Sequence, residues 1–152
     1  MAKYAIEDVV PHDHPMILID SIQSYAETTA VCQVKITEDV NFYDSALNGV
    51  PAYVGVEYMA QSIAAFANAN ERDQGKEVAL GFLVSSRKYQ ASEPVFKLGE
   101  ELTVNVERLY KEDNGLSVFD CQILVDEQVR VDATINVFQP DEPEAFIKEQ
   151  TK

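Results

Sequence analysis

The chain has 152 residues, of which 46% are hydrophobic, so it is long enough for one domain with a sizeable core. Its 26 acidic and 12 basic residues give a formal net charge of −14. This charge argues against nucleic acid and anionic membrane surfaces as partners, because both are bound through clustered Lys and Arg. The two cysteines, Cys32 and Cys121, fall in strand-like runs and are expected to be reduced thiols. Since the N-terminal sequence MAKYAIEDVV has no secretory pattern, we expect a cytoplasmic protein.

The first third of the chain is predicted to contain one helical turn and two strands. The turn covers residues 6–10, and a loop bracketed by two prolines follows at residues 11–15. Residues 16–22 and 30–36 are apolar or alternating runs that predict strands. Residues 41–49 are predicted to be irregular, since their Asp, Asn and Gly favour turns.

Residues 51–70, PAYVGVEYMAQSIAAFANAN, predict a long core helix with a single charge, Glu57. Proline suits the first turn of a helix, and we expect the helix to end before Gly75. Its Gln, Ser and Asn residues and the lack of basic flanks argue against a membrane span. A helix that is apolar on nearly every side must be buried on most faces. We therefore expect a sheet wrapped around it, or a second subunit packed against it.

The second half of the chain predicts an antiparallel meander. Its four predicted strands cover residues 81–89, 101–110, 116–125 and 128–138. The sequence DNG at 113–115 is a strong hairpin turn signal, and DE at 126–127 is a weaker one. This order predicts a single α+β domain over residues 1–152, with the helix against a curved sheet. From about residue 140 the chain becomes an acidic tail.

Several segments resemble, in the same order, the hotdog-fold beta-hydroxyacyl-(acyl carrier protein) dehydratases. The family opens with Leu-Pro-His, two variable residues, Pro and an apolar strand ending in Asp, which resembles PHDHPMILIDSI. Its central-helix motif, in which Pro-Gly precedes a Glu followed by Ala-Met-Ala-Gln, resembles VPAYVGVEYMAQS. Its later Phe-Leu, basic-aromatic and Gly-Asp-x-Leu segments resemble GFLVSSRKYQ and LGEEL. The similarity runs over most of residues 5–138 and looks closest to the predicted 3-hydroxyacyl-carrier-protein dehydratases of aryl polyene pigment synthesis.

The resemblance implies a hotdog fold, in which an antiparallel sheet wraps around the long helix, and a dimer with a continuous sheet. It implies active sites at the dimer interface, with one catalytic residue from each subunit. It also implies a hydro-lyase of fatty-acid or polyene-type synthesis that converts a 3-hydroxyacyl thioester on acyl carrier protein into a trans-2-enoyl thioester. We expect a homodimer, or a pair with another hotdog subunit. We expect no cofactor and no metal, because His12 and His14 without a further Cys or His cluster are a weak ligand signal.

The chain departs from the family at two positions. The family's catalytic His, in a Gly-His-Phe-Pro-Gly segment ahead of the helix, has Tyr43 as its gap-free counterpart here. Ala52 stands where the family has Gly after the helix-starting Pro. The Pro-His of the family is kept as His12, so we hypothesise that His12 supplies the catalytic base. The alternative is a histidine that only holds its own loop through backbone hydrogen bonds.

Dehydration requires a base for the proton alpha to the thioester, an acid for the leaving hydroxyl and donors for the enolate-like oxygen. Glu57 is the first candidate, because a carboxylate in apolar surroundings is costly to ionise and tends to carry a proton near neutral pH. The alternative is a structural Glu satisfied by Tyr hydroxyls or by Arg87. Gln61 lies one turn beyond Glu57, and the resemblance implies that it orients the carboxylate. Asn68 continues this stripe, either along a substrate groove or at a wet interface.

Further residues are predicted to bind substrate. The backbone N–H groups near Ala52 and Tyr53 are expected to polarise the thioester carbonyl, helped by the helix dipole. Tyr43 either lines the pocket or packs in the core. Phe82 is included for its place in the segment that resembles the family's Phe-Leu.

Docking of an acidic carrier protein on this acidic chain requires a local basic patch. Arg87 and Lys88, in the basic-aromatic segment, and Lys97 are the candidates, and the alternative is three solvated surface cations. Two other functions stay open. A thioesterase of the same fold also uses a helix carboxylate, with water as the attacking species. A non-catalytic subunit would bind acyl chains or pair with an active partner.

Overall fold

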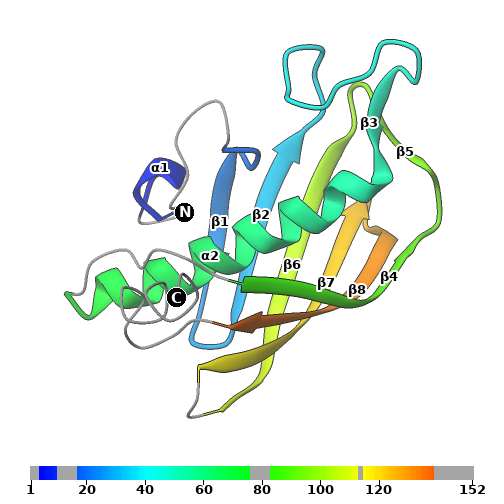
Figure 1. Ribbon diagram of the computed structural model, residues 1–152. Coiled ribbons are helices and arrows are strands. Elements are labelled where there is room, and N and C mark those ends of the chain that lie inside the picture. Colours follow the sequence, from blue (N-terminus) through cyan, green and yellow to red (C-terminus); the bar gives the residue numbers. More distant parts are fainter. Residues whose placement is uncertain (1–3, 10–16, 76–82, 113–114, 139–152) are drawn as a thin grey trace, which may run out of the picture.

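A long helix lies against a curved antiparallel sheet, as Figure 1 shows. The computed structural model describes residues 4–9, 17–75, 83–112 and 115–138. Its elements in chain order are α1 (Ile6–Val9), β1 (Ser21–Tyr25), β2 (Thr29–Lys35), β3 (Gly49–Pro51), the 3-10 turn η1 (Ala52–Val54), α2 (Gly55–Asp73), β4 (Leu83–Ala91), β5 (Val95–Lys97), β6 (Glu101–Lys111), β7 (Leu116–Val125) and β8 (Gln128–Phe138). Within these ranges one sheet has six strands in the order β1-β2-β6-β7-β8-β4, and β3 pairs with β5 in a separate ribbon. This is the predicted α+β hotdog architecture.

The last three strands of the predicted meander lie where the sequence predicts them, whereas the first, β4, runs to Ala91 and pairs with β8 instead of β6. β7 and β8 have the predicted bounds, and β6 extends one residue further. Asp126 and Glu127 both have positive φ, 51° and 66°, as a tight two-residue hairpin turn requires. The alternation along β6 buries Leu102, Val104 and Val106 on the side of the helix. Local periodicity therefore sets both the bounds and the buried faces of these strands.

The sequence does not predict the β3–β5 ribbon. Pro51 pairs with Val95 in this ribbon, so it ends a strand instead of starting the helix. α2 begins at Gly55, after the single turn of η1, and it ends before Gly75 as predicted. Each strand of the ribbon has three residues, and its partner is distant in sequence. Such a short pairing leaves no periodic signal.

The first strand also lies further along the chain than the predicted residues 16–22. The N–H of Leu18 donates a hydrogen bond to Oε1 of Gln61 on α2, with a distance of 2.8 Å. The carboxylate of Asp20 accepts a hydrogen bond from the N–H of Lys35 at 2.7 Å. Residues 17–20 therefore bind the helix and the start of the sheet before β1 begins.

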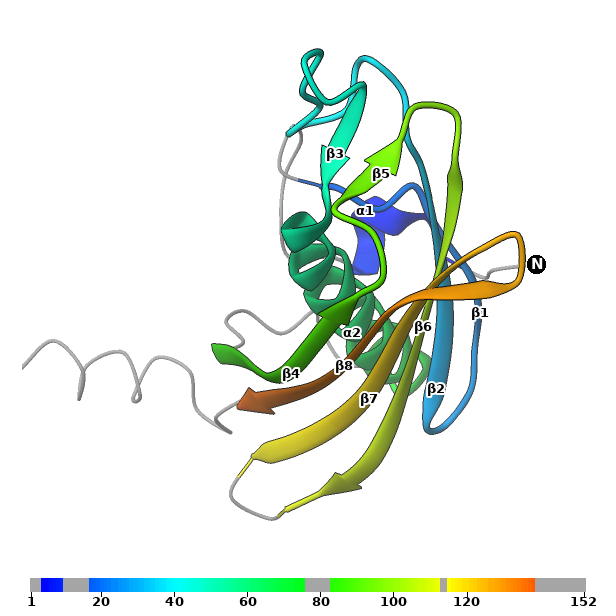
Figure 2. The same ribbon diagram turned by 90° about the vertical axis from the view of Figure 1, so that its right-hand side faces the viewer.

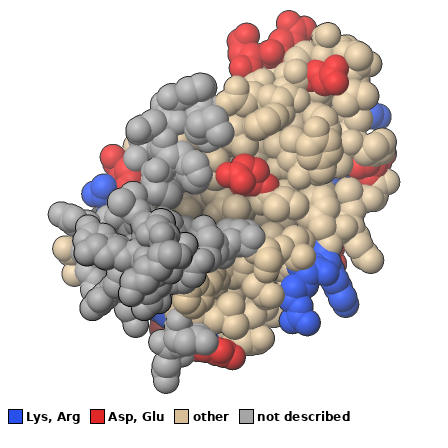
Figure 3. Space-filling view, viewed as in Figure 1, with Lys and Arg blue, Asp and Glu red and all other residues tan. Residues whose placement is uncertain are grey.

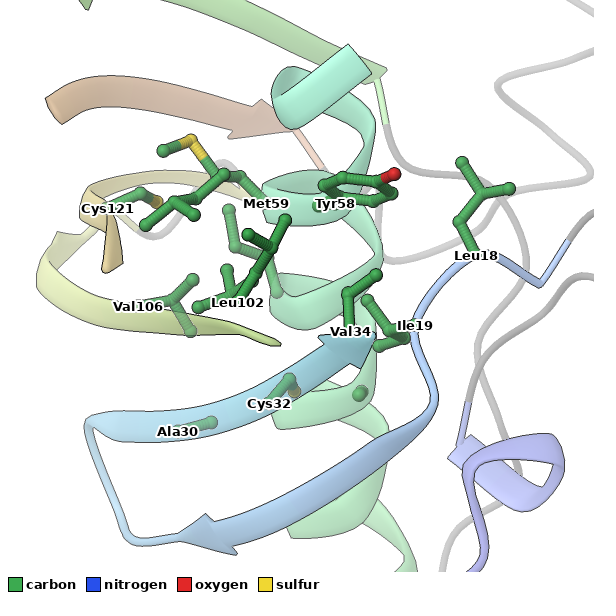
Figure 4. Close-up of a cluster of buried hydrophobic side chains, with 14 of the residues drawn as sticks. Leu18, Ile19, Ala30, Cys32, Val34, Tyr58, Met59, Leu102, Val106 and Cys121 are labelled. Atoms are coloured by element: carbon green, nitrogen blue, oxygen red, sulfur yellow. The ribbon is translucent and has the colours of Figure 1, made fainter. Parts of the chain in front are cut away.

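The core lies between α2 and the concave face of the sheet (Figure 4). Met59 is fully buried and points from α2 toward the side chains of the sheet, among them Leu102 and Cys121. Burial of each large apolar side chain contributes about 1.5–3 kcal/mol to folding. Cys32 and Cys121 are buried, unbridged thiols. Burial raises the pKa of the Cys32 thiol to about 11, which keeps it unreactive.

Three carboxylates lie near one another on the outer face of the sheet. Asp120 on β7 pairs with Glu107 on β6, and Asp132 lies on the neighbouring strand β8. Partial burial raises the pKa of Asp120, and the charges of Asp132 and Glu107 raise it further. The folded state therefore holds the proton of Asp120 more tightly than the unfolded state does.

Asp120→Asn should raise the thermal stability near neutral pH. The wild type loses stability as the pH rises through the carboxyl range, because its raised pKa means that the folded state gives up this proton later than the unfolded state. The amide lacks this penalty, so we expect its Tm to be higher by about 1–3 °C near neutral pH. At a pH below the carboxyl range the two Tm values should converge in calorimetry. Glu27→Gln, at an exposed carboxylate between β1 and β2, is the control, and a difference that is independent of pH would contradict the assignment.

Candidate active site

Glu57 lies in the first turn of α2 and is exposed in the single chain. This corrects the expectation of a buried carboxylate. The sheet covers one side of α2, and Figure 2 shows the other side of its first turns outside the sheet. On that side Tyr53 is 73% exposed, while Val56 and Ala60 are partly buried. We call Tyr53, Val56, Glu57 and Ala60 the open stripe.

The side chain of Gln61 connects Glu57 to the core. It is 1% exposed, and its Oε1 accepts the hydrogen bond from the N–H of Leu18. A backbone N–H can only donate, so the amide oxygen faces Leu18 and the amide nitrogen is left to face Glu57. That nitrogen donates to Oε1 of Glu57 at 3.3 Å. The structure thus brings Glu57 and Gln61 together, in the arrangement that the resemblance implies.

A second buried amide, Asn68, connects α2 to the N-terminal residues. Asn68 is fully buried, and its Nδ2 donates to the carbonyl of Val9 at 2.9 Å. Val9 directly precedes residues 10–16, which carry His12 and lie outside the described residues. Gln61 binds the chain just beyond the other end of that segment. The two amides therefore tie both flanks of the His12 segment to the helix that bears Glu57.

The start of the helix is fixed by contacts with β4 and with the residues before β5. The N–H of Ala52 donates to the carbonyl of Pro94 at 2.8 Å, so it is engaged within the chain, and its contact with a thioester stays a prediction. The hydroxyl of Tyr89 donates to the carbonyl of Ala52. Burial raises the pKa of Tyr89 to about 12, so it stays a donor at neutral pH. Gly55 permits this approach, because a Cβ there would lie 2.1 Å from the Tyr89 oxygen.

The other predicted substrate-binding residues are more widely spread. Tyr43 packs against the core, and its hydroxyl donates to Oδ1 of Asn48 at 3.0 Å, which agrees with its structural alternative. Tyr53 lies at the exposed end of the open stripe, and a role for its N–H stays a prediction. Phe82 lies outside the described residues. Sequence reasoning did not single out Tyr89, although it stands in the basic-aromatic segment.

Two of the three predicted docking cations lie at an edge of the six-stranded sheet, and the third lies in the β3–β5 ribbon. Arg87 and Lys88 are exposed on β4, the edge strand next to β8, and Lys97 is exposed on β5. The register shifts between Ser86 and Lys88, which marks a bulge at Arg87. Figure 3 shows basic side chains over β4, on a face whose other charges are few and mainly acidic.

Comparison with known proteins places the chain in a family. The family model for ApeP-like proteins, described as ApeP dehydratase, matches residues 4–148. The chain belongs to the ApeP-like dehydratase family. It is similar to a 3-hydroxyacyl-[acyl-carrier-protein] dehydratase FabZ of Psychromonas ingrahamii, with 31% identity over 139 residues, 86% of this chain and 87% of that protein. The FabZ of Lactobacillus helveticus is 25% identical over 140 residues, 90% of this chain and 91% of that protein. The predicted family and the hydro-lyase class are confirmed.

Solved structures of other proteins share the fold of this chain. The dehydratase heterocomplex ApeI:P from Xenorhabdus doucetiae contains a chain that matches with a TM-score of 0.90 and 21% identity, over 99% of this chain and 100% of that chain. A hypothetical thioesterase from Streptococcus pneumoniae, solved with coenzyme A, matches with a TM-score of 0.59 and 15% identity, over 78% of this chain and 84% of that chain. In the part of the chain that the structure describes, no helix has the length and hydropathy of a membrane span.

Tyr89→Phe should loosen the start of the helix. The change keeps the aromatic ring but removes the hydrogen bond to the Ala52 carbonyl. We expect the free energy of unfolding to fall by about 1 kcal/mol and Tm by about 3 °C, measured by circular dichroism on heating. Tyr110→Phe, at a half-exposed ring in β6, is the matched control and should leave Tm unchanged. Equal Tm values for all three proteins would show that the Tyr89 hydroxyl does not hold the helix.

Proposed function

We propose that this protein removes water from a 3-hydroxyacyl thioester on acyl carrier protein, with Glu57 as a proton-transferring residue. The relatives named as 3-hydroxyacyl-[acyl-carrier-protein] dehydratases support this substrate class, in fatty-acid or polyene-type synthesis. The observation that carries the proposal is the contact between Glu57, on the open stripe, and the buried amide of Gln61. A buried amide there holds a carboxyl group within an apolar surface, where an acyl chain can lie beside it.

The reaction breaks a C2–H bond and the C3–O bond and forms the C2–C3 double bond. A base takes the proton from C2, the electron pair of that bond becomes the new double bond, and the 3-hydroxyl gains a proton and leaves as water. We assign the second proton transfer to Glu57. Once an acyl chain or a second subunit covers the open stripe, a carboxyl group there becomes costly to ionise and retains its proton for the leaving group.

The base is assigned to His12. The support is indirect, because the residues on both flanks of its segment are tied to α2 by Asn68 and Gln61. These contacts hold Val9 and Leu18, on either side of that segment, to the helix of Glu57. The second candidate is a histidine from another hotdog subunit, since Tyr43 stands where the family has its helix-preceding His.

The site is proposed to be completed by a second hotdog subunit. The open stripe leaves Glu57 uncovered in the single chain, and β4 is an edge strand of the described sheet, which suits continuation across two subunits. A homodimer is our first assignment, and a heteromeric pair is the second because the similar ApeI:P structure is a heterocomplex. The buried free thiols of Cys32 and Cys121 support the proposed cytoplasmic location.

Glu57→Gln should abolish most dehydratase activity without unfolding the protein. The amide keeps the shape of the carboxyl group but cannot transfer a proton, so kcat should fall about 100-fold or more. The measurement is the appearance of the enoyl thioester by ultraviolet absorbance, with mass spectrometry to separate it from the free thiol that a thioesterase would release. Glu71→Gln, at the next carboxylate along α2, is the matched control and should keep full activity.

His12→Ala tests the base separately from the acid. A loss of similar size to that of Glu57→Gln would support His12, because both proton transfers belong to one elimination. Full activity in His12→Ala, with Glu57→Gln inactive, would move the base to the partner subunit. Full activity in Glu57→Gln would refute the proposed acid.

Charge reversal of Arg87 and Lys88 to Glu should weaken the use of the carrier-bound substrate. The two cations are exposed, so reversing their charge mainly lowers the rate of association with the acidic carrier protein. We therefore expect kcat/KM to fall about 3- to 10-fold at low salt. The same variant should use a short pantetheine thioester as well as the wild type does. Lys111→Glu, at the far end of β6, is the control. Equal losses with both substrates would refute docking and indicate damage at the β4 edge.

A further inference from the structure

Tyr58 directly follows Glu57 on α2 but is turned into the protein. It is 1% exposed, and its hydroxyl has no hydrogen-bond partner within the described part of the chain. A buried hydroxyl that leaves water without gaining a partner costs free energy, and phenylalanine would fill the same space without that cost. The retained hydroxyl therefore indicates a partner that the described residues do not supply.

The other buried polar side chains of this helix show how the chain normally satisfies such groups. Gln61 and Asn68 bind the backbone of residues near the N-terminus. Ser62 donates to the carbonyl of Tyr58, one turn earlier, at 2.7 Å. Against this background the unpaired phenol of Tyr58 is an exception at the position next to the proposed acid.

The geometry directs the hydroxyl toward the side of the helix start where Gln61 acts. Figure 4 shows the Tyr58 hydroxyl pointing away from Met59 and the sheet, toward the segment of Leu18. Leu18 is the residue that Gln61 binds, and Gln61 lies three residues after Tyr58 on the same helix. The ring of Tyr58 is packed against Phe96, with centroids 6.0 Å apart, so its direction is set by the core.

The phenol is a neutral donor at working pH. Burial is the main cause that raises the pKa of Tyr58, and the nearby groups Asp20 and Tyr89 raise it further. A phenol with a raised pKa keeps its proton and can donate it in a hydrogen bond. In apolar surroundings such a donor interacts strongly with an oxygen that gains negative charge.

The position of Tyr58 is also one where the chain differs from the motif that it resembles. In that motif the residue after the Glu is Ala, and here it is a large aromatic residue. At this end of the helix the N–H of Ala52 is already bound to the carbonyl of Pro94.

We propose that Tyr58 is a substrate-contacting residue whose hydroxyl donates a hydrogen bond to an oxygen of the acyl thioester lying beside Glu57. This inference rests on the proposed function, and it names a contact that the function does not by itself require. Both the thioester carbonyl and the 3-hydroxyl are acceptors of suitable chemistry.

The test is Tyr58→Phe, made in the assembly that has dehydratase activity. Because the hydroxyl has no partner among the described residues, Tm should stay the same or rise, while kcat/KM for a 3-hydroxyacyl thioester should fall about tenfold. Tyr25→Phe is the matched control, since it removes a hydroxyl that donates to Asp73 at 2.8 Å, away from Glu57. That control should lower Tm and keep kcat/KM.

Calorimetric binding of a saturated acyl pantetheine thioester separates the two acceptors. Weaker binding of this analogue to Tyr58→Phe assigns the hydroxyl to the carbonyl, and unchanged binding with lower kcat/KM assigns it to the 3-hydroxyl. If the wild type is active and Tyr58→Phe has the same kcat/KM, the inference about Tyr58 is wrong but the proposed function stands. A fall in Tm, or dissociation of the subunits in sedimentation, overturns it by revealing a structural partner. A wild type that neither binds nor dehydrates any acyl thioester overturns the proposed function, and the Tyr58 contact with it.

Discussion

The side chain of Gln61 is almost fully buried and must satisfy its oxygen and its nitrogen inside the protein. It does so with the N–H of Leu18 on one side and the carboxylate of Glu57 on the other. The first contact draws residues 17–20 from the sheet onto the helix. The second contact fixes the orientation of the Glu57 carboxylate at the surface. A single amide therefore links the path of the N-terminal chain to the geometry of the proposed acid, and a change at Gln61 would affect both.

The long helix α2 is covered by the sheet on one side only, and the proposed active site lies on the uncovered side. The curved sheet covers one side of α2 (Figure 2), while Tyr53 and Glu57 of the open stripe are exposed. In the single chain the Glu57 carboxylate faces water. Its chemistry changes only when an acyl chain or a second subunit removes that water. The reaction that we propose for Glu57 is therefore a property of the assembled, loaded protein.

Features with a local cause could be predicted from the sequence. The bounds of β7 and β8 follow from alternation, and the turn at Asp126 and Glu127 follows from residues that tolerate positive φ. Features that depend on partners distant in the sequence could not be predicted in this way. The apolar pattern of α2 says that the helix is covered, but it does not say which side its own chain covers, so the exposure of Glu57 was missed. The N–H of Ala52 donates to the carbonyl of Pro94, more than forty positions along the chain, and no local sequence pattern predicts that hydrogen bond.

The polar groups of α2 can be ordered by what satisfies them. Ser62 is satisfied by its own helix, and Gln61 and Asn68 by other parts of the chain. Tyr58 finds no acceptor among the described residues. Natural cores rarely keep such a group, because replacing it with an apolar residue of the same shape removes the cost of its lost hydration. Its persistence one residue from Glu57 is better explained by binding than by folding, because the contact that would offset its cost is then made only when substrate is bound.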